Sequence, residues 1–471
     1  MGQEVSHSHF SPEDNVAFAL RLQEETQLLR KQVLQGAFSS KAVMGGFEIE
    51  ACLIDKACHP APVNKDFFKY FNNPLATPEL AKFNIELNNN PLPLKGTCFE
   101  KFEAELDLVF KEADTVAANM DVRVLLIGIL PTLKLDDFCL ENMSDMKRYK
   151  ALNDIVLKAR NSKPLRFDIK GKDHFQLIQN TVMMEAATTS FQVHLQTPWK
   201  QAHHYYNASI IASAPLMAIS GNSPFLLGKQ LWHETRIPLF EQAVDTGSGS
   251  QRVSFGSGYA KTSISECFNE NLRDYPVLLP MLFEDKANKF SHLRLHNGVI
   301  WRWNRPLVGF DPDGTPHIRI EHRILPAGPT IIDMIVNAVF FYGLSQSIMH
   351  KVQSNEKMSF ETAKENFYSA AKRGLNASIL WDNKTYQGAT LQKLIIDKLL
   401  PQAEQGLREL EIPEKSIKHY LGIIADRTSS GQTGSIWQIN HLKSIDGNMK
   451  KLTQDYLRHQ YQDQPVHNWA S

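Results

Sequence analysis

Carboxylate, amide, imidazole and guanidinium side chains alternate with apolar residues in four short stretches, Phe47–Glu50, Phe83–Asn88, Phe191–Gln196 and His317–Ile324. Because successive side chains of a β-strand point to opposite faces, each stretch predicts a strand with one apolar and one polar face. If the four strands pair in one sheet, its polar face gathers ionisable groups: Glu48, Glu50, Glu86, His194, Arg319, Glu321 and Arg323. Carboxylates at such density need balancing cations, which indicates a metal-dependent enzyme.

Glu48 and Glu50 are the clearest candidate ligands. Two positions apart on a strand, their side chains lie about 7 Å apart on one face, a spacing that suits neighbouring hard cations. Oxygen ligands favour magnesium or manganese over zinc. A lone Glu-x-Glu is more often the exposed face of an edge strand. The assignment of Glu48 and Glu50 as metal ligands therefore depends on the other three polar stretches.

The remaining polar groups each have a structural alternative. Glu86 lies among asparagines that include Asn84, and this segment binds a charged small molecule or forms an asparagine-rich turn. His194 would face the polar side with Gln192, although a single histidine is more often structural. The alternating Arg319, Glu321 and Arg323 could equally form a ladder of salt bridges.

The composition favours small-molecule substrates. Lysine plus arginine equals aspartate plus glutamate, 51 each, among 471 residues, so no basic excess indicates nucleic acid or an anionic membrane. Five cysteines without a CxxC pair argue against disulfides and thiolate zinc sites and favour a reducing, cytoplasmic location. We see no apolar run that approaches the roughly 18 residues of a membrane span. Gly2 with Ser6 fits a short myristoylation pattern that often matches by chance.

The order of predicted elements indicates a mixed core of strands and helices, on which a helical C-terminal region packs. We divide the chain into a helical segment 1–40, a catalytic sheet with helices 41–350, and C-terminal helices 351–471 packed on the same domain. The predicted elements are helices 12–36, 99–119 and 203–220, an apolar strand 122–129, a mobile Gly/Ser-rich loop 247–258, a hairpin over 293–305 with an Asn-Gly turn, and helices after residue 330.

Several common catalytic motifs are absent from the sequence. It contains no Walker-type phosphate loop, no G-x-G-x-x-G after a strand and no G-x-S-x-G elbow. A bound nucleotide would therefore depend on metals and arginines to hold its phosphates. Arg236, Arg302 and Arg305 add positive charge near the middle of the chain, although each could be a surface residue.

The order and spacing of longer motifs resemble glutamate-cysteine ligase family 2, the carboxylate-amine ligases. These motifs cover nearly the whole chain: GFEIE, FNIELNNNPLPLKG, IGILPTL, MSDMKRYKALN, ATTSFQVHLQ, SGNSPFLLGKQLWHETRIPLFEQA, LHNGVIWRWNRP, PHIRIEHRILPAGPT and PVHNW. The clearest departure is the Gly/Ser-rich stretch 247–258, which leaves lid closure and substrate choice open.

The resemblance implies an α+β fold like that of glutamine synthetase, in which a curved antiparallel sheet packed by helices forms a funnel, with ATP entering at one side and the amino acids at the other. It also implies ATP-dependent amide synthesis through a γ-glutamyl phosphate, with glutamate and cysteine as substrates. It implies Mg²⁺ or Mn²⁺ bound by five residues: Glu48, Glu50, Glu86, His194 and Glu321. Arg323 and Arg319 would neutralise the transferring phosphoryl group, and Arg236, Arg302, Asn84 and Gln192 would bind substrate or ATP. Other functions stay open: a catalytically silent binding member, a ligase using another amine, and a metal-dependent amide hydrolase that would act without ATP.

Overall fold

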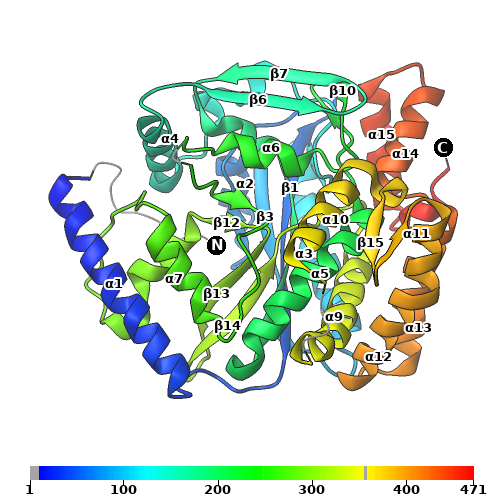
Figure 1. The fold of residues 1–471 in the computed structure, drawn as a ribbon. Helices are drawn as coiled ribbons and strands as arrows, with labels where there is room; N and C mark the ends of the chain where they lie inside the picture. Colours follow the sequence, from blue (N-terminus) through cyan, green and yellow to red (C-terminus); the bar gives the residue numbers. More distant parts are fainter. Residues whose placement is uncertain (1–9, 248, 355–357, 471) are drawn as a thin grey trace.

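A curled antiparallel sheet forms the centre of the computed structural model, which describes residues 10–247, 249–354 and 358–470 (Figure 1). Gly2 of the myristoylation pattern lies outside the described residues. The sheet has eight strands, with the path β13-β14-β8-β1-β3-β2, while β4 and β5 also pair with β1. Its strands are β1 (Met44–Asp55), β2 (Ala76–Pro78), β3 (Asn84–Asn88), β4 (Leu92–Pro93), β5 (Val122–Leu125), β8 (Phe191–Thr197), β13 (Asn304–Phe310) and β14 (Pro316–His322).

The four alternating stretches of the sequence form β1, β3, β8 and β14, and the prediction that they pair in one sheet is confirmed. The antiparallel register sets Glu50 of β1 opposite Glu86 of β3. It also sets Glu321 of β14 opposite His194 of β8. Because directly opposed residues point to the same face, the register brings distant acidic groups together.

Helices α3 (Cys98–Ala118), α5 (Ala202–Ser220) and α9 (Ile331–Gln353) cover the apolar face of the sheet. Phe47 of β1 packs there against Phe102 of α3 and Tyr342 of α9. Helix α9 is the one helix in the described part of the chain that is long and apolar enough to cross a membrane, contrary to our expectation from the sequence. The fold explains its composition, because 94% of its apolar window is buried in the protein core.

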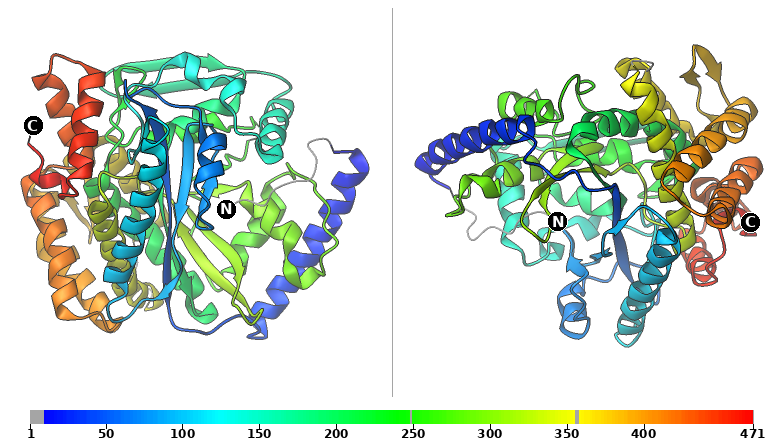
Figure 2. Two further views of the ribbon diagram at one scale, coloured as in Figure 1. Left: turned by 180° about the vertical axis from the view of Figure 1, so that it is seen from behind. Right: turned by 90° about the horizontal axis from the view of Figure 1, so that it is seen from below.

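Helices α1 (Pro12–Leu34) and the C-terminal group lie on opposite sides of the sheet (Figures 1 and 2). Helix α1 begins as predicted, with Ser11 as the N-cap whose side chain accepts a hydrogen bond from the Asp14 N–H. The C-terminal helices are α10 (Phe360–Arg373), α11 (Ala389–Leu394), α12 (Leu400–Glu409), α13 (Glu414–Ser430), α14 (Gly434–Ser444) and α15 (Met449–Tyr461).

Further elements of the fold are shorter. They are α2 (Asn64–Tyr70), α4 (Lys147–Ala159), the 3₁₀ turn η3 (Val182–Ala187), α6 (Arg236–Ala243), α7 (Ser265–Asp274), the 3₁₀ turn η5 (Ala287–Lys289) and α8 (Ser291–Gly298). Small two-stranded sheets complete the fold: β6 (Leu165–Lys170) with β7 (His174–Gln179), β9 (Phe225–Leu226) with β10 (Lys229–Gln230), β11 (Val253–Ser254) with β12 (Trp301–Arg302), and β15 (Ile379–Trp381) with β16 (Lys384–Tyr386).

The predicted hairpin over 293–305 is wrong, because residues 291–298 form α8. Asn297 is not in a two-residue turn. Its side chain donates to the carbonyl of Pro306 in β13 and accepts a hydrogen bond from Asn271 in α7. Tertiary hydrogen bonds therefore override a strong local turn signal. The apolar strand predicted over 122–129 also ends early, at Leu125.

The Gly/Ser-rich stretch 247–258 is not a free loop throughout. Val253 and Ser254 form β11, which pairs in parallel with β12, and Phe255 is fully buried. Arg252 is also buried, and its guanidinium donates to the Val299 and Pro276 carbonyls. These apolar and charged anchors among the glycines fix the segment to the core.

Candidate active site

A cavity, here called the main cavity, opens over the polar face of the sheet. The sheet contributes Glu48, Glu50, Glu86, Gln192, Arg305, Arg319 and Glu321 to its lining, and Arg323, which directly follows β14, lies beside them. Segments outside the sheet contribute Glu79, Arg148, Tyr149, Glu185, Arg294 and Asn297 among others. Most of the residues predicted from the sequence therefore surround one space, although they are spread over nearly 280 positions between Glu48 and Arg323.

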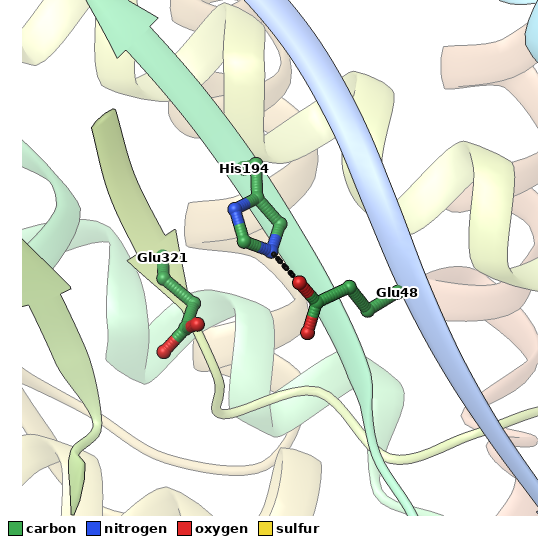
Figure 3. A group of neighbouring side chains, drawn as sticks. All are labelled: Glu48, His194 and Glu321. Atoms are coloured by element: carbon green, nitrogen blue, oxygen red, sulfur yellow. Dashed lines mark ion pairs between the residues drawn. The ribbon is translucent and has the colours of Figure 1, made fainter. Parts of the chain in front are cut away.

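Glu48, His194 and Glu321 form a compact cluster supplied by three adjacent strands (Figure 3). One ligand atom from each lies within 4.8 Å of the others, and all three residues are buried. His194 Nε2 lies 3.2 Å from Glu48 Oε1, the ion pair drawn in Figure 3, and has no further hydrogen-bond partner among the described residues. Two carboxylates and an imidazole nitrogen that converge in this way fit a divalent cation such as Mg²⁺ or Mn²⁺.

Two arginines hold Glu321 ionised. Arg305 Nε and Nη2 donate to the two carboxylate oxygens at 2.8 and 3.1 Å, and Arg323 Nη1 donates at 3.0 Å. Burial opposes ionisation, but the two guanidiniums keep the pKa of Glu321 well below its usual range. Arg323 also donates to Gln192 Oε1, so this network spans β8 and β14.

Glu50 and Glu86 stand beside the compact cluster. Glu50 accepts from the Ser190 N–H at 2.7 Å and from Gln192 Nε2 at 2.8 Å. Glu86 accepts from Asn88 Nδ2 at 2.9 Å. Burial and the charge of Glu48 raise the pKa of Glu86 to about 8, and burial also raises the pKa of Glu50. Without a cation, Glu86 therefore retains its proton near neutral pH.

Sequence patterns missed Glu79 and Glu185, which add further acidic groups to the cavity wall. Burial and the charges of Glu79 and Glu50 raise the pKa of Glu185 to about 8. Glu79 accepts a hydrogen bond of 3.1 Å from Tyr149 OH, whose ring lies 4.6 Å beneath the Arg148 guanidinium. Arg148 and Tyr149 belong to the MSDMKRYKALN motif, which could have drawn attention to them. Glu79 and Glu185 lie in a loop and a 3₁₀ turn, where no periodic pattern marks them.

Asn84 and Arg236 line a smaller, adjoining cavity together with Glu50, Glu79, Glu185 and Arg323. Asn84 Oδ1 is buried and has no hydrogen-bond partner, so it is available to a ligand. The Arg236 guanidinium donates to Glu234 and to the backbone carbonyls of Arg323 and Ile324. Arg236 therefore fixes the end of β14 and, with it, the position of Arg323.

Arg302 does not line either of these cavities. Its Nη2 donates to Glu270 Oε1 at 2.7 Å and to Asn271 Oδ1 at 2.9 Å. These contacts join β12 to α7 and give Arg302 a structural environment, and its role in binding substrate or ATP stays a prediction. His322 lies on the apolar face, where it stacks on Phe341 of α9, and His317 pairs with Asp311.

Comparison with known proteins agrees with this architecture. A glutamate-cysteine ligase from Francisella tularensis, solved in complex with AMP, matches 92% of this chain and 90% of its own at 12% identity and a TM-score of 0.58. A bifunctional glutathione synthetase from Pasteurella multocida covers 93% of this chain and 55% of its own at 11% identity and a TM-score of 0.49. No curated protein matches the sequence.

The Francisella structure confirms the expected fold class, a curved antiparallel sheet packed by helices. The sequence itself matches the model of glutamate-cysteine ligase family 2 over residues 44–455, most of the chain. The protein therefore belongs to glutamate-cysteine ligase family 2.

Proposed function

We propose that the protein is an ATP-dependent ligase that joins the γ-carboxyl group of glutamate to cysteine through a γ-glutamyl phosphate, in cytoplasmic glutathione biosynthesis. Family membership supports an ATP-dependent carboxylate-amine ligase. One observation carries the proposal: the buried cluster of Glu48, His194 and Glu321 beside the cavity. Phosphoryl transfer needs a divalent metal ion to neutralise the phosphate charge, and these three side chains are suited to bind one.

In this proposal Glu48, His194 and Glu321 hold one divalent cation, and the opposed Glu50 and Glu86 hold another. Bound Mg²⁺ would neutralise phosphate charge and orient the nucleotide. The excess of acidic groups supports this assignment: Arg305 and Arg323 balance Glu321, whereas the pKa values of Glu50 and Glu86 are raised, and a cation beside them would favour their ionised forms.

The arginines of the cavity supply the remaining positive charge. Arg323 reaches both the main and the smaller cavity, so we place it where the γ-phosphate meets the substrate carboxylate. Arg319 lines the main cavity on the same face of β14 and would contact the phosphates. Gln192 and Asn84 would orient the amino acids, and attack by the amine nitrogen on the acyl phosphate would form the amide and release phosphate.

Phosphate release and product mass test this proposal together. Purified protein is incubated with ATP, Mg²⁺, glutamate and each amino acid of a panel that includes cysteine. We expect phosphate release that requires both glutamate and the amine, and a product with the mass of γ-glutamylcysteine. Glu48→Gln should abolish both signals, while the exposed Glu24→Gln should retain them.

The other candidate functions give different results in the same assay. A hydrolase would cleave amides without ATP, and a silent member would bind nucleotide without turnover. If the product contains another amine, cysteine is not the substrate, but the proposed ligase reaction stands. If no amine stimulates phosphate release and Glu48→Gln matches the wild type, the ligase proposal is wrong.

A further inference from the structure

Helix α1 lies outside the region that matches the family, which begins at residue 44, yet it contacts the wall of the main cavity. It packs against α7, α8 and η5 along one side of the molecule (Figures 1 and 2). Its inward face buries Glu25, which is only 1% exposed. A buried carboxylate on an otherwise apolar contact requires specific partners.

The partners of Glu25 lie at the first turn of α8. Its Oε2 accepts from the Leu293 N–H at 2.8 Å, and its Oε1 lies 2.7 Å from His292 Nδ1. His292 Nε2 accepts from the Phe283 N–H at 3.2 Å, so Nδ1 carries the proton and donates it to Glu25. Phe290, the N-cap residue of α8, provides no side-chain acceptor. Glu25 therefore caps α8 from another helix.

Helix α8 forms part of the cavity wall. Arg294, Leu295, Asn297 and Gly298 line the main cavity, and Arg305 Nη1 donates to the Gly298 carbonyl at 3.1 Å. Glu25 thus holds the first turn of α8, and Arg305, which also binds Glu321, holds its last residue. The helix is fixed at both ends, so its side chains keep a defined position relative to the acidic site.

Arg294 and Arg319 together form what we call the cationic corner of the cavity. Both line it, and within the described residues neither takes part in an ion pair. Burial and the positive charge of Arg319 lower the pKa of Arg294, whose guanidinium lies 5.7 Å from the centre of the Phe310 ring. Two unpaired guanidiniums in one cavity suit an anion with several phosphate groups.

We propose that α1 is a positioning element, in which Glu25 holds α8 so that Arg294 joins Arg319 in binding the polyphosphate chain of the nucleotide. This inference rests on the proposed function only for the identity of that nucleotide as ATP. Arg294 would contact the ligand directly, whereas Glu25 would act through α8.

Binding of magnesium tripolyphosphate, measured by titration calorimetry, tests the inference without requiring turnover. Arg294→Met and Glu25→Ala should each weaken binding about tenfold, which corresponds to loss of one charge-assisted contact. The double variant should be no weaker than Arg294→Met, because both changes remove the same contact. Glu24→Ala, at an exposed position on the same helix, should bind like the wild type.

Glu25→Gln retains one acceptor oxygen for the first turn of α8 and should bind more tightly than Glu25→Ala. If Glu25→Ala does not fold, Glu25→Gln replaces it in the double-variant test. The tripolyphosphate affinity of Glu25→Gln combined with Arg294→Met is then compared with that of Arg294→Met alone. The Michaelis constant for ATP should rise in parallel with the tripolyphosphate dissociation constant.

Two results would overturn the inference. One is a set of Glu25 variants that lower the melting temperature but leave tripolyphosphate binding unchanged, which would make Glu25 merely structural. The other is a double variant about a hundredfold weaker than the wild type, because additive effects would mean that Glu25 does not act through Arg294. A wild type that binds tripolyphosphate through Arg294 and Glu25 but shows no amine-dependent ATP turnover would reject the proposed function and uphold the inference.

Discussion

Glu321 and Glu86 belong to the same face of one sheet, yet their surroundings give them opposite protonation behaviour. Arg305 and Arg323 keep the pKa of Glu321 low, whereas burial and the charge of Glu48 raise the pKa of Glu86 to about 8. The chemical type of a residue therefore does not settle its charge. Neighbouring guanidiniums favour the carboxylate at one end of the site, and a cation is required to do the same at the other.

Glu48→Gln tests the metal cluster at the level of one residue. The amide keeps an oxygen in place but removes the negative charge, so we expect Mn²⁺ affinity to fall on the order of a hundredfold. Electron paramagnetic resonance of free Mn²⁺ during a titration measures this directly. Glu24→Gln removes a charge from an exposed position and should leave the titration unchanged. Equal affinities for Glu48→Gln and the wild type would show that Glu48 is not a ligand.

Glu241 offers a test of pH-dependent stability away from the metal cluster. Its carboxyl accepts hydrogen bonds from Trp303 Nε1 at 2.9 Å and Tyr368 OH at 2.7 Å, and burial raises its pKa to about 7. The folded state thus holds this proton to a higher pH than the unfolded chain, in which a glutamate titrates near 4.3. The contribution of Glu241 to stability must fall as pH rises through that interval.

Glu241→Gln keeps an acceptor for both donors and does not titrate. We expect the free energy of unfolding of the variant, relative to the wild type, to increase between about pH 4.3 and pH 7 by roughly 1.4 kcal/mol per pH unit. Urea unfolding at several pH values measures the difference. Parallel stability curves for the two proteins would contradict the raised pKa.

At the scale of elements, α9 and α12 approach each other so closely that two glycines form the contact. A Cβ atom on Gly406 of α12 would lie 2.0 Å from the Gly343 carbonyl oxygen of α9. Backbone atoms fill this space, so a methyl group there requires one helix to move. Because α9 also covers the sheet, where Tyr342 OH donates to the His194 carbonyl at 2.9 Å, this contact helps to set the position of the polar face.

Gly406→Ala should therefore lower the free energy of unfolding by about 1–3 kcal/mol, the typical cost of overpacking. Gly422 lies within α13 and a Cβ atom there would meet nothing within 4 Å. Gly422→Ala should instead stabilise the protein by about 0.5–1 kcal/mol, because alanine has the higher helix propensity. Guanidinium unfolding of both variants measures the contrast, and a stabilising Gly406→Ala would contradict the close packing of α9 on α12.

At the scale of the whole molecule, the site is assembled from strands that occur between residues 44 and 322, and helices from both ends of the chain pack around them. The division of the chain into segments 1–40, 41–350 and 351–471 remains a prediction. Since the cavity forms only when these distant strands pair, a ligand of the cavity binds the folded state and not the unfolded chain.

MgATP should consequently raise the thermal unfolding midpoint. At a concentration of one hundred times the dissociation constant, binding to the folded state alone adds about 2.7 kcal/mol. Differential scanning calorimetry should show a midpoint that rises with MgATP concentration, and chelation of Mg²⁺ should reverse most of the increase. A midpoint that does not depend on MgATP would contradict nucleotide binding in the cavity.

The sequence by itself determined which residues share the polar face. A period of two along β1, β3, β8 and β14 separates Glu48, Glu86, His194 and Glu321 from the core, and no long-range information is needed to see it. The helices α1, α3 and α5 also followed from local caps and spacing, to within two residues at each end.

Only the tertiary structure decided how these faces meet. Strand order and register depend on pairing between residues up to some 150 positions apart, and this pairing brings Glu321 beside His194. Glu79, Glu185 and Arg294 line the cavity from a loop, a 3₁₀ turn and a helix. No repeating sequence pattern there predicts which way these side chains point. Helix α8 stands where a hairpin was predicted, and its contacts with Glu25 of α1, Asn271 and Pro306 are tertiary ones that the local turn signal does not contain.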